Sequence, residues 1–395
     1  MRVLQIDFAD PSFPLSLVEK DDPKLPSSEW ALCRVIRGGI CGSDTQLFEN
    51  PTPNPLMTRF VGLPMEMGHE IGAVVEDAGA DFPYPAGTRI AVDPVIACEA
   101  RGIDPKCEQC SKGLVSCCAN LASRRLTPGF ALGYTTGLGS GWSDVVAVHR
   151  SMAYPVPEEV PDSATSLAEP LSVSVHGVLG APPDQGGYAL VVGCGIIGIT
   201  AIAALRYLFP EVFVVAVARY PHQAAVAEEV GANAVVMGRN QEGTARPEYE
   251  VFEELAQLVE DRLVSSGGEA MLARGFDYVI EAAGSESSLT MALRAAAPRA
   301  TVLMLGVMGR TSVDLTTLWL KELRVAGSFC HGSHRIAGQN ASSIEIALEM
   351  LANQRLTAKQ VVSATFPLEE YREALATAMD HRTTGSIKVV FDPSQ

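Results

Sequence analysis

The stretch GGICGSD at residues 38–44 places Cys41 just ahead of a Gly-Ser-Asp run. A cysteine there is either a small buried hydrophobic residue or a metal ligand, and the residue type alone does not distinguish the two. The decision depends on which other side chains in the chain can meet it.

Possible partners of Cys41 occur in GHE at 68–70 and AEP at 168–170. A catalytic zinc takes about three protein ligands of nitrogen, sulfur or oxygen type and keeps one position open. Cys41, His69 and a carboxylate from Glu70 or Glu169 would supply that set. The spacing alone leaves an alternative, in which His69 is a hydrogen-bonded core histidine and Glu70 lies on a solvated turn.

A second group of metal-ligating residues is more specific. Five of the nine cysteines fall between residues 98 and 118, and four follow the spacing C-x8-C-x2-C-x7-C: Cys98, Cys107, Cys110 and Cys118. Four thiolates on one loop, in a compartment that disfavours disulfides, are typical of a closed structural zinc site. Two alternatives stay open: Cys117 in place of Cys118, and Asp104 in place of Cys98.

The run GCGIIG at 193–198 follows the pattern G-x-G-x-x-G between a strand-like and a helix-like segment. The pattern is weak by itself, but its context is that of a dinucleotide-binding turn. Gly193 would allow the tight turn, Gly195 the approach of a pyrophosphate, and Gly198 the packing of helix on sheet. Ile196 and Ile197 would begin the helix whose N-terminus attracts phosphate. The alternative is a βα turn without a cofactor.

The ribose of such a cofactor is recognised about 20 residues further on. That position is Ala218, followed by Arg219. Because no carboxylate stands there to bind ribose hydroxyls, a 2′-phosphate can lie against Arg219, with help from His222. We therefore expect NADP rather than NAD; otherwise Arg219 is a solvated cation and either cofactor is used. Gly306 and Val307, which end an apolar run, are the remaining expected cofactor contacts.

The elements that position these residues change in character near Ser163. The first part is rich in Gly, Pro and short β-branched runs such as 71–76 and 89–95, typical of an irregular β domain. Strands then alternate with helices, which predicts βαβ units and a doubly wound parallel sheet. Strands are expected at 188–193, 212–218, 276–284, 301–307 and 324–329, and helices at 199–208, 222–232 and 287–296. The polar segment 238–270 resembles an insertion.

Three segments follow from this organisation. They are a β domain over 1–162, a nucleotide-binding domain over 163–332, and a return to the first domain over 333–395, with a helix near 341–353 and a strand at 387–391. A length of 395 residues, with 47% hydrophobic and 19% charged residues, fits two well-packed domains.

The charge and the N-terminus limit the possible partners. A net charge of −16 argues against nucleic acid and anionic membranes, which require clustered cations. The N-terminus does not read as a signal peptide, and the uncharged stretch 189–205 is interpreted as a buried strand, turn and helix rather than a membrane span. We expect a cytoplasmic protein that acts on a small molecule.

Taken together and in order, GGICGSD, GHE, the cysteine loop, EPL at 169–171 and GCGIIG resemble the zinc-dependent medium-chain alcohol dehydrogenases. The resemblance covers essentially the whole chain. It implies a GroES-like β domain built from both ends of the chain and a Rossmann domain between them. This sequence departs from the family in its longer cysteine loop, which has six extra residues before Cys107, and in Ala218.

The resemblance also implies roles for single residues. Cys41 and His69 match the catalytic zinc ligands, and Glu70 matches a residue that is a ligand in many members and an adjacent or exchanging group in others. Glu169 stands where polyol and sugar dehydrogenases have a glutamate and alcohol dehydrogenases proper have a cysteine. Ser43 matches the hydroxyl that relays the substrate proton, and Asp44 the carboxylate that orients the histidine.

The implied activity is the interconversion of an alcohol (sugar, polyol or other secondary alcohol) and its carbonyl with NADP(H), supported by a catalytic and a structural zinc. A homodimer or homotetramer through the edge of the Rossmann sheet is expected by analogy. Candidates for the wall of the substrate pocket are Leu47, Phe48, Trp142, Phe329 and His331. Two alternatives are a zinc-independent double-bond reductase of the same superfamily and an NADP-binding sensor.

Overall fold

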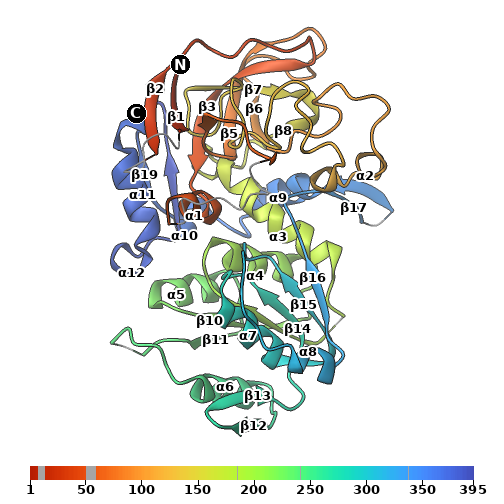
Figure 1. Cartoon of the computed structure of the whole chain (residues 1–395), viewed down its shortest axis with the longest axis vertical. Helices are drawn as coiled ribbons and strands as arrows, with labels where there is room; N and C mark the ends of the chain where they lie inside the picture. Colours follow the sequence, from red (N-terminus) through yellow and green to blue (C-terminus); the bar gives the residue numbers. More distant parts are fainter. Residues whose placement is uncertain (8–13, 50–58, 185, 241, 337) are drawn as a thin grey trace. The chain divides into compact units, whose positions relative to one another are not determined.

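In the computed structural model the chain forms two compact units (Figure 1), and the structure describes residues 1–7, 14–49, 59–184, 186–240, 242–336 and 338–395. One unit, the catalytic unit, contains Met1–Ser172 and Cys330–Gln395, and the other, the nucleotide unit, contains Val173–Phe329. The sequence predicts boundaries after residues 162 and 332, whereas the units change after Ser172 and after Phe329. The first boundary falls inside helix α3 (Ala168–Gly180), which continues from one unit into the other without a break.

The catalytic unit is built on a seven-stranded sheet of order β19-β20-β3-β5-β6-β8, with β7 paired to β3. The strands are β3 (Trp30–Gly39), β5 (Glu70–Ala78), β6 (Arg89–Val92), β7 (Val145–His149), β8 (Ala153–Pro155), β19 (Val362–Phe366) and β20 (Lys388–Phe391). A second sheet, β2-β1-β4, consists of β1 (Arg2–Ile6), β2 (Leu15–Glu19) and β4 (Met65–Glu66). The chain end joins the first sheet because Val390 pairs with Gly39.

Short helices and one hairpin complete this unit. They are α1 (Gly42–Glu49), α2 (Glu108–Ser111), η2 (Val115–Cys117), η3 (Arg150–Met152), η4 (Asp162–Leu167), the hairpin β17 (Ser333–Ile336) and β18 (Gln339–Ser342), α9 (Ser343–Ala352), α10 (Ala358–Val361), η5 (Leu368–Glu370), α11 (Tyr371–Met379) and α12 (His381–Thr384). Trp30, Ile71 and Val148 belong to one buried hydrophobic cluster formed largely by residues of the seven-stranded sheet.

The nucleotide unit is a parallel six-stranded sheet of order β11-β10-β9-β14-β15-β16. Its strands are β9 (Tyr188–Val192), β10 (Phe213–Ala218), β11 (Ala234–Met237), β14 (Phe276–Glu281), β15 (Ala296–Met304) and β16 (Arg324–Gly327). Its helices, besides part of α3, are α4 (Ile196–Leu208), α5 (Pro221–Glu229), α6 (Glu248–Leu258), α7 (Glu286–Ala295) and α8 (Thr316–Leu320). This order is that of the doubly wound dinucleotide-binding fold.

Helices cover both faces of this sheet. Leu190, Val215 and Val279 share one core cluster with residues of α6 and α7, so these two helices cover one face. The alternate strand residues point to the opposite face, where right-handed crossovers place α4 and α5.

The described residues of the segment 238–270 form regular elements of this fold, so the segment is not an insertion of undefined structure. It contains α6 and the antiparallel hairpin of β12 (Leu263–Ser266) and β13 (Glu269–Leu272). Although the segment is polar overall, α6 has one apolar face. Its residues Val251, Phe252 and Leu255 are buried in the cluster that includes the strands of the sheet.

The uncharged stretch 189–205 forms β9, the glycine-rich turn and most of α4. Within the described residues, no helix combines the length and apolar character that a membrane span requires.

Candidate active site

Cys41, Asp44 and His69 lie together at the start of α1. The Asp44 carboxylate is fully buried and accepts a hydrogen bond from the Cys41 amide at 2.9 Å through Oδ2. Its Oδ1 lies 3.4 Å from His69 Nδ1. One carboxylate therefore fixes the backbone of Cys41 and faces the imidazole of His69, which leaves Nε2 of the ring for a metal.

Glu70 follows His69 at the start of β5 and is fully buried. Both of its carboxylate oxygens contact Lys388 Nζ, at 2.6 and 2.8 Å, and Nζ also donates to Ile40 O at 2.8 Å. Gly39 is the partner of Glu70 across the sheet, and a Cβ there would lie 1.8 Å from Glu70 Oε2. Glycine at 39 therefore makes room for the carboxylate.

The donor set of this group fits a metal ion. Ligand atoms of Cys41, His69 and Glu70 all lie within 4.8 Å of one another. Sulfur, imidazole nitrogen and carboxylate oxygen are the donors of a three-ligand catalytic zinc site. Among the described residues, Glu169 lies outside the group that meets this distance, so the structure brings Glu70 closer to Cys41 and His69 than Glu169.

Glu169 is in the first turn of α3, and its carboxylate contacts His331 rather than joining the group of Cys41, His69 and Glu70. Glu169 Oε1 lies 3.0 Å from His331 Nε2, and His331 Nδ1 lies 3.2 Å from Asp93 Oδ1. Burial lowers the pKa of His331, but the carboxylates of Asp93 and Glu169 outweigh burial and raise it to about 10. The two carboxylates on either side therefore favour the imidazolium form of His331.

Ser43 lies beside a residue that sequence reasoning did not identify. Its Oγ is 3.0 Å from the hydroxyl of Tyr134, and the Tyr134 ring is centred 5.3 Å from the His69 ring. Burial raises the pKa of Tyr134, so this hydroxyl stays protonated and can share a proton with Ser43.

The expected pocket-wall residues have different environments. Leu47 and Phe48 of α1 are partly buried, and Phe329 is 48% exposed at the end of the nucleotide unit. Trp142 is a core residue: it is fully buried, its indole nitrogen donates to Gly39 O at 2.9 Å, and its ring packs against Phe391. His331 belongs to the network with Glu169 described above.

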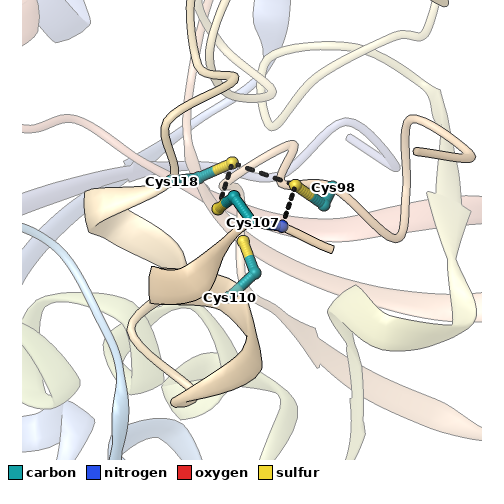
Figure 2. A group of neighbouring side chains, drawn as sticks. All are labelled: Cys98, Cys107, Cys110 and Cys118. Atoms are coloured by element: carbon teal, nitrogen blue, oxygen red, sulfur yellow. Dashed lines mark hydrogen bonds between the residues drawn. The ribbon is translucent and has the colours of Figure 1, made fainter. Parts of the chain in front are cut away.

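The four cysteines of the loop converge on one point, as Figure 2 shows. Cys118 Sγ lies 3.6 Å from Cys98 Sγ and 3.9 Å from Cys107 Sγ. Four sulfurs at ~2.3 Å from a tetrahedral zinc would lie ~3.8 Å apart, so these separations fit a structural zinc site. A hydrogen bond from the Cys110 amide lowers the pKa of Cys107 to about 6, which favours the thiolate that a metal requires.

The two alternatives for this ligand set lie outside the cluster. The side chain of Cys117 and that of Asp104 are exposed, whereas Cys98 and Cys118 are buried. The longer loop still closes because backbone groups fold it back: the Ile103 amide donates to Cys98 O at 2.8 Å, and the Cys107 amide contacts Cys98 Sγ at 3.4 Å.

The turn between β9 and α4 has the conformation that its three glycines suggest. Gly193 has φ of +100°, and a Cβ on Gly198 would lie 1.8 Å from Gly193 O. A Cβ on Gly195 would meet nothing within 4 Å, so this glycine borders open space. Gly195 is also the N-cap of α4, so the amides of Ile196 and Ile197 begin the helix at that space.

At the end of β10, Ala218 is buried and Arg219 is exposed. Tyr220 and His222 follow, with their rings stacked at 5.6 Å and 9°. The guanidinium of Arg239 lies 5.9 Å from the centre of the Tyr220 ring. Cationic and aromatic groups therefore gather where a dinucleotide's ribose is recognised.

Gly306 and Val307 follow β15 at the same edge of the sheet. Val307 is 56% exposed, and Gly306 lies against Gly284 and the buried Glu281. Glu281 Oε1 accepts from the amides of Ala283 and Gly284 at 2.9 and 2.8 Å, which shapes the loop after β14.

Comparison with known families agrees with this arrangement. Residues 27–158 match the alcohol dehydrogenase GroES-like domain, and residues 197–353 match the zinc-binding dehydrogenase model. The chain belongs to the family of zinc-dependent alcohol dehydrogenases. This confirms the fold class and the family that the motifs indicated.

Individual relatives of this dehydrogenase are moderately similar in sequence. It is 28% identical to the probable D-xylulose reductase A of Arthroderma otae, over 89% of this chain and 87% of the relative. It is 25% identical to the L-idonate 5-dehydrogenase (NAD(P)(+)) of Escherichia coli, over 91% of each chain. The structure of a putative zinc-binding dehydrogenase from Sinorhizobium meliloti bound to NADP has a TM-score of 0.74, 24% identity and 99% coverage of both chains.

Four residues of the dehydrogenase escaped sequence reasoning: Asp93, Tyr134, Arg239 and Lys388. Two of them left a signal, since Asp93 and Lys388 are charged residues inside apolar runs, RIAVDPV and IKVVF. A buried charge needs a partner, which marks such positions as sites of an ion pair. Tyr134 and Arg239 carry no such signal in the sequence.

Proposed function

We propose that this dehydrogenase interconverts a secondary alcohol of the polyol or sugar class and its carbonyl compound, with NADP(H) as hydride carrier. The observation that carries the proposal is the convergence of the ligand atoms of Cys41, His69 and Glu70. Glu169 stands in the EPL stretch, where the resemblance expects a glutamate in polyol and sugar dehydrogenases and a cysteine in alcohol dehydrogenases proper. Relatives named for xylulose and idonate support the substrate class.

Each residue has a definable task in this reaction. Cys41, His69 and Glu70 or Glu169 would hold a zinc ion, which supplies Lewis-acid polarisation of the substrate oxygen when bound. Asp44 orients His69, and Ser43 with Tyr134 passes the hydroxyl proton away from the site. The cysteines of the loop would hold a second, structural zinc.

NADP preference is supported by the end of β10. Ala218 carries no carboxylate that would repel a 2′-phosphate, Arg219 next to it is an exposed cation, and Arg239 lies over the Tyr220 ring. An arginine next to this position accommodates the 2′-phosphate of NADP in dinucleotide-binding folds.

A substrate panel run in both directions, with NADP(H) and NAD(H), tests the activity. We expect turnover with polyols or the corresponding ketoses, and about two zinc atoms per chain. Cys41→Ser and His69→Ala should abolish turnover but leave NADPH binding intact, since the glycine-rich turn is unchanged. Turnover that survives in these variants would refute the role of zinc in catalysis.

The cofactor assignment is tested by Ala218→Asp with Arg219→Ile. We expect the ratio of kcat/KM for NADP to that for NAD to fall by about 10-fold or more, since one ion pair is lost and a like charge is added. Arg246→Ile, at an arginine that pairs with Glu254 at 2.9 Å, is the matched control. An unchanged ratio would show that the 2′-phosphate is recognised elsewhere.

A further inference from the structure

Asp93, His331 and Glu169 form a buried line of side chains in the catalytic unit, with the imidazole between the two carboxyl groups. Their side chains are each at least nine-tenths buried, with residue exposures of 4%, 0% and 5%. Asp93 follows β6, Glu169 begins α3, and His331 follows the return of the chain from the nucleotide unit. The three residues meet only because the fold brings three distant segments together.

Each ring nitrogen of His331 lies close to a carboxylate oxygen. Nδ1 lies 3.2 Å from Asp93 Oδ1 and Nε2 lies 3.0 Å from Glu169 Oε1. The ring therefore cannot rotate without breaking its contacts with Asp93 and Glu169. Its position fixes Glu169 Oε1, much as a carboxylate fixes a ligating histidine in other metal sites.

The backbone of His331 is held in turn by the cysteine loop. Ser116, which lies between Cys110 and Cys118, donates its hydroxyl to His331 O at 2.8 Å. The Ser333 amide donates to Gly113 O of the same loop at 2.9 Å. Asp93 Oδ1 accepts from the Val95 amide at 2.9 Å, just before Cys98. The backbone of His331 is therefore held by Ser116 of the cysteine loop, and its ring is held by Asp93 in the segment that leads into that loop.

We propose that His331 is a positioning residue that holds Glu169 in the active site, and that the cysteine loop sets the position of His331 through Ser116. The proposal rests on the proposed function, in which Glu169 acts beside the metal. The loop thereby has a task in catalysis beyond holding the fold together. Without His331, the buried Glu169 carboxylate would lose the polar side chain 3.0 Å from its Oε1 and would reorient.

The test compares His331→Phe, His331→Gln and Ser116→Ala with two matched controls. Ser111→Ala removes a hydroxyl of the same loop that bonds to Cys107 O, and His334→Gln changes a histidine on β17. Four readouts are needed: kcat and KM on the alcohol that the panel identifies, the visible spectrum of the Co2+-substituted enzyme, the rate of zinc release to a chelator, and NADPH binding by fluorescence.

We expect His331→Phe to lower kcat by about 10–100-fold, to shift the Co2+ absorption and to speed zinc release, as is typical when a supporting partner is lost. His331→Gln should recover part of kcat because its amide group offers a polar N–H donor next to Glu169. Ser116→Ala should lower kcat in the same direction by a few-fold, whereas Ser111→Ala and His334→Gln should not. NADPH affinity should stay within about twofold in all five.

Two results would overturn the proposal. If the His331 variants lower only the melting temperature, with kcat, KM and the Co2+ spectrum unchanged, His331 has a structural role alone. If Ser116→Ala matches Ser111→Ala, the cysteine loop does not set its position. Should the unmodified enzyme turn over no substrate in the panel, the proposed function fails, and the Co2+ spectrum and zinc release still decide the role of His331.

Discussion

At the scale of single residues, the candidate site contains two buried carboxylates, Glu70 and Glu169, and each contacts a different basic side chain. Glu70 has Lys388 as its buried cation, and Glu169 has His331. Burial lowers the pKa of Lys388, but Glu70 outweighs burial and raises it above its ordinary value. Each acid therefore has its own compensating charge, and a metal ion would be a third cation beside them.

The Glu70–Lys388 pair leads to a prediction about stability. Lys388→Met leaves Glu70 buried without its cation, and in the zinc-depleted protein this should lower the free energy of unfolding by about 3–5 kcal/mol. With zinc bound the loss should be smaller, because the metal also compensates Glu70. Urea unfolding with and without a chelator measures both values.

Lys112→Met is the control for this substitution, since Lys112 forms an exposed pair with Glu108. Its effect should be below about 1 kcal/mol. The double variant Lys388→Met with Glu70→Gln should regain part of the loss. Equal effects of Lys388→Met and Lys112→Met would contradict the assignment of Lys388 to a buried ion pair.

Among the elements, the junction of β13, α7 and β15 depends on one lysine at the end of α8. Lys321 is buried, and its Nζ donates to Leu272 O at 2.8 Å and to Ala296 O at 2.7 Å. Carbonyl dipoles satisfy its hydrogen bonds but do not neutralise its charge. Burial therefore lowers the pKa of Lys321 to about 8.

This shift predicts how stability depends on pH. Between about pH 8 and the ordinary pKa of lysine, the unfolded chain binds more protons at Lys321 than the folded chain, so the free energy of unfolding rises with pH. The unmodified protein should gain on the order of 2–3 kcal/mol relative to Lys321→Met over this range. Urea unfolding followed by circular dichroism at pH 7, 8, 9 and 10 checks it.

Lys359→Met, at an exposed lysine, is the control. Its free energy of unfolding should depend on pH in the same way as that of the unmodified protein. If the difference between the unmodified protein and Lys321→Met is independent of pH, Lys321 is not charged and buried at neutral pH.

The whole molecule presents one feature that suggests self-association. Strand β16 lies at an edge of the six-stranded sheet, and Val325 on it is 43% exposed. Trp319 and Leu320, which precede it, are 69% and 53% exposed. The unpaired backbone groups of an edge strand are a template for pairing with another chain, and the exposed apolar side chains of Val325, Trp319 and Leu320 would be covered by such a partner. We propose that two copies associate through β16, in line with the homo-oligomer expected by analogy.

Val325→Lys tests this association. A lysine on the edge strand opposes pairing with a second copy, so the variant should sediment as a monomer if the unmodified protein is a dimer or tetramer. Tyr249→Lys, at an exposed residue of α6, is the control and should leave the oligomer intact. An oligomer that survives Val325→Lys would place the interface elsewhere.

Features that depend on short separations along the chain were predictable from the order of the residues. The cysteine loop, the glycine-rich turn and the alternating strands and helices are local patterns, because each is set by backbone conformation and spacing within a few tens of residues. Cys98, Cys107, Cys110 and Cys118 were therefore identified together, and so was the parallel sheet of the nucleotide unit. An amphipathic helix in a polar segment, α6, was missed because its apolar stripe is short.

The partners of the buried charged side chains, by contrast, became known from the folded chain, because they lie far apart in the sequence. Glu70 and Lys388 are 318 residues apart in the chain, and Asp93 and His331 are 238 residues apart. The Glu70–Lys388 pair forms because strands from both ends of the chain enter one sheet. The Asp93–His331 pair forms because the chain returns to the catalytic unit at Cys330. Buried charges must be compensated in place, and no local pattern records which partner the fold will bring.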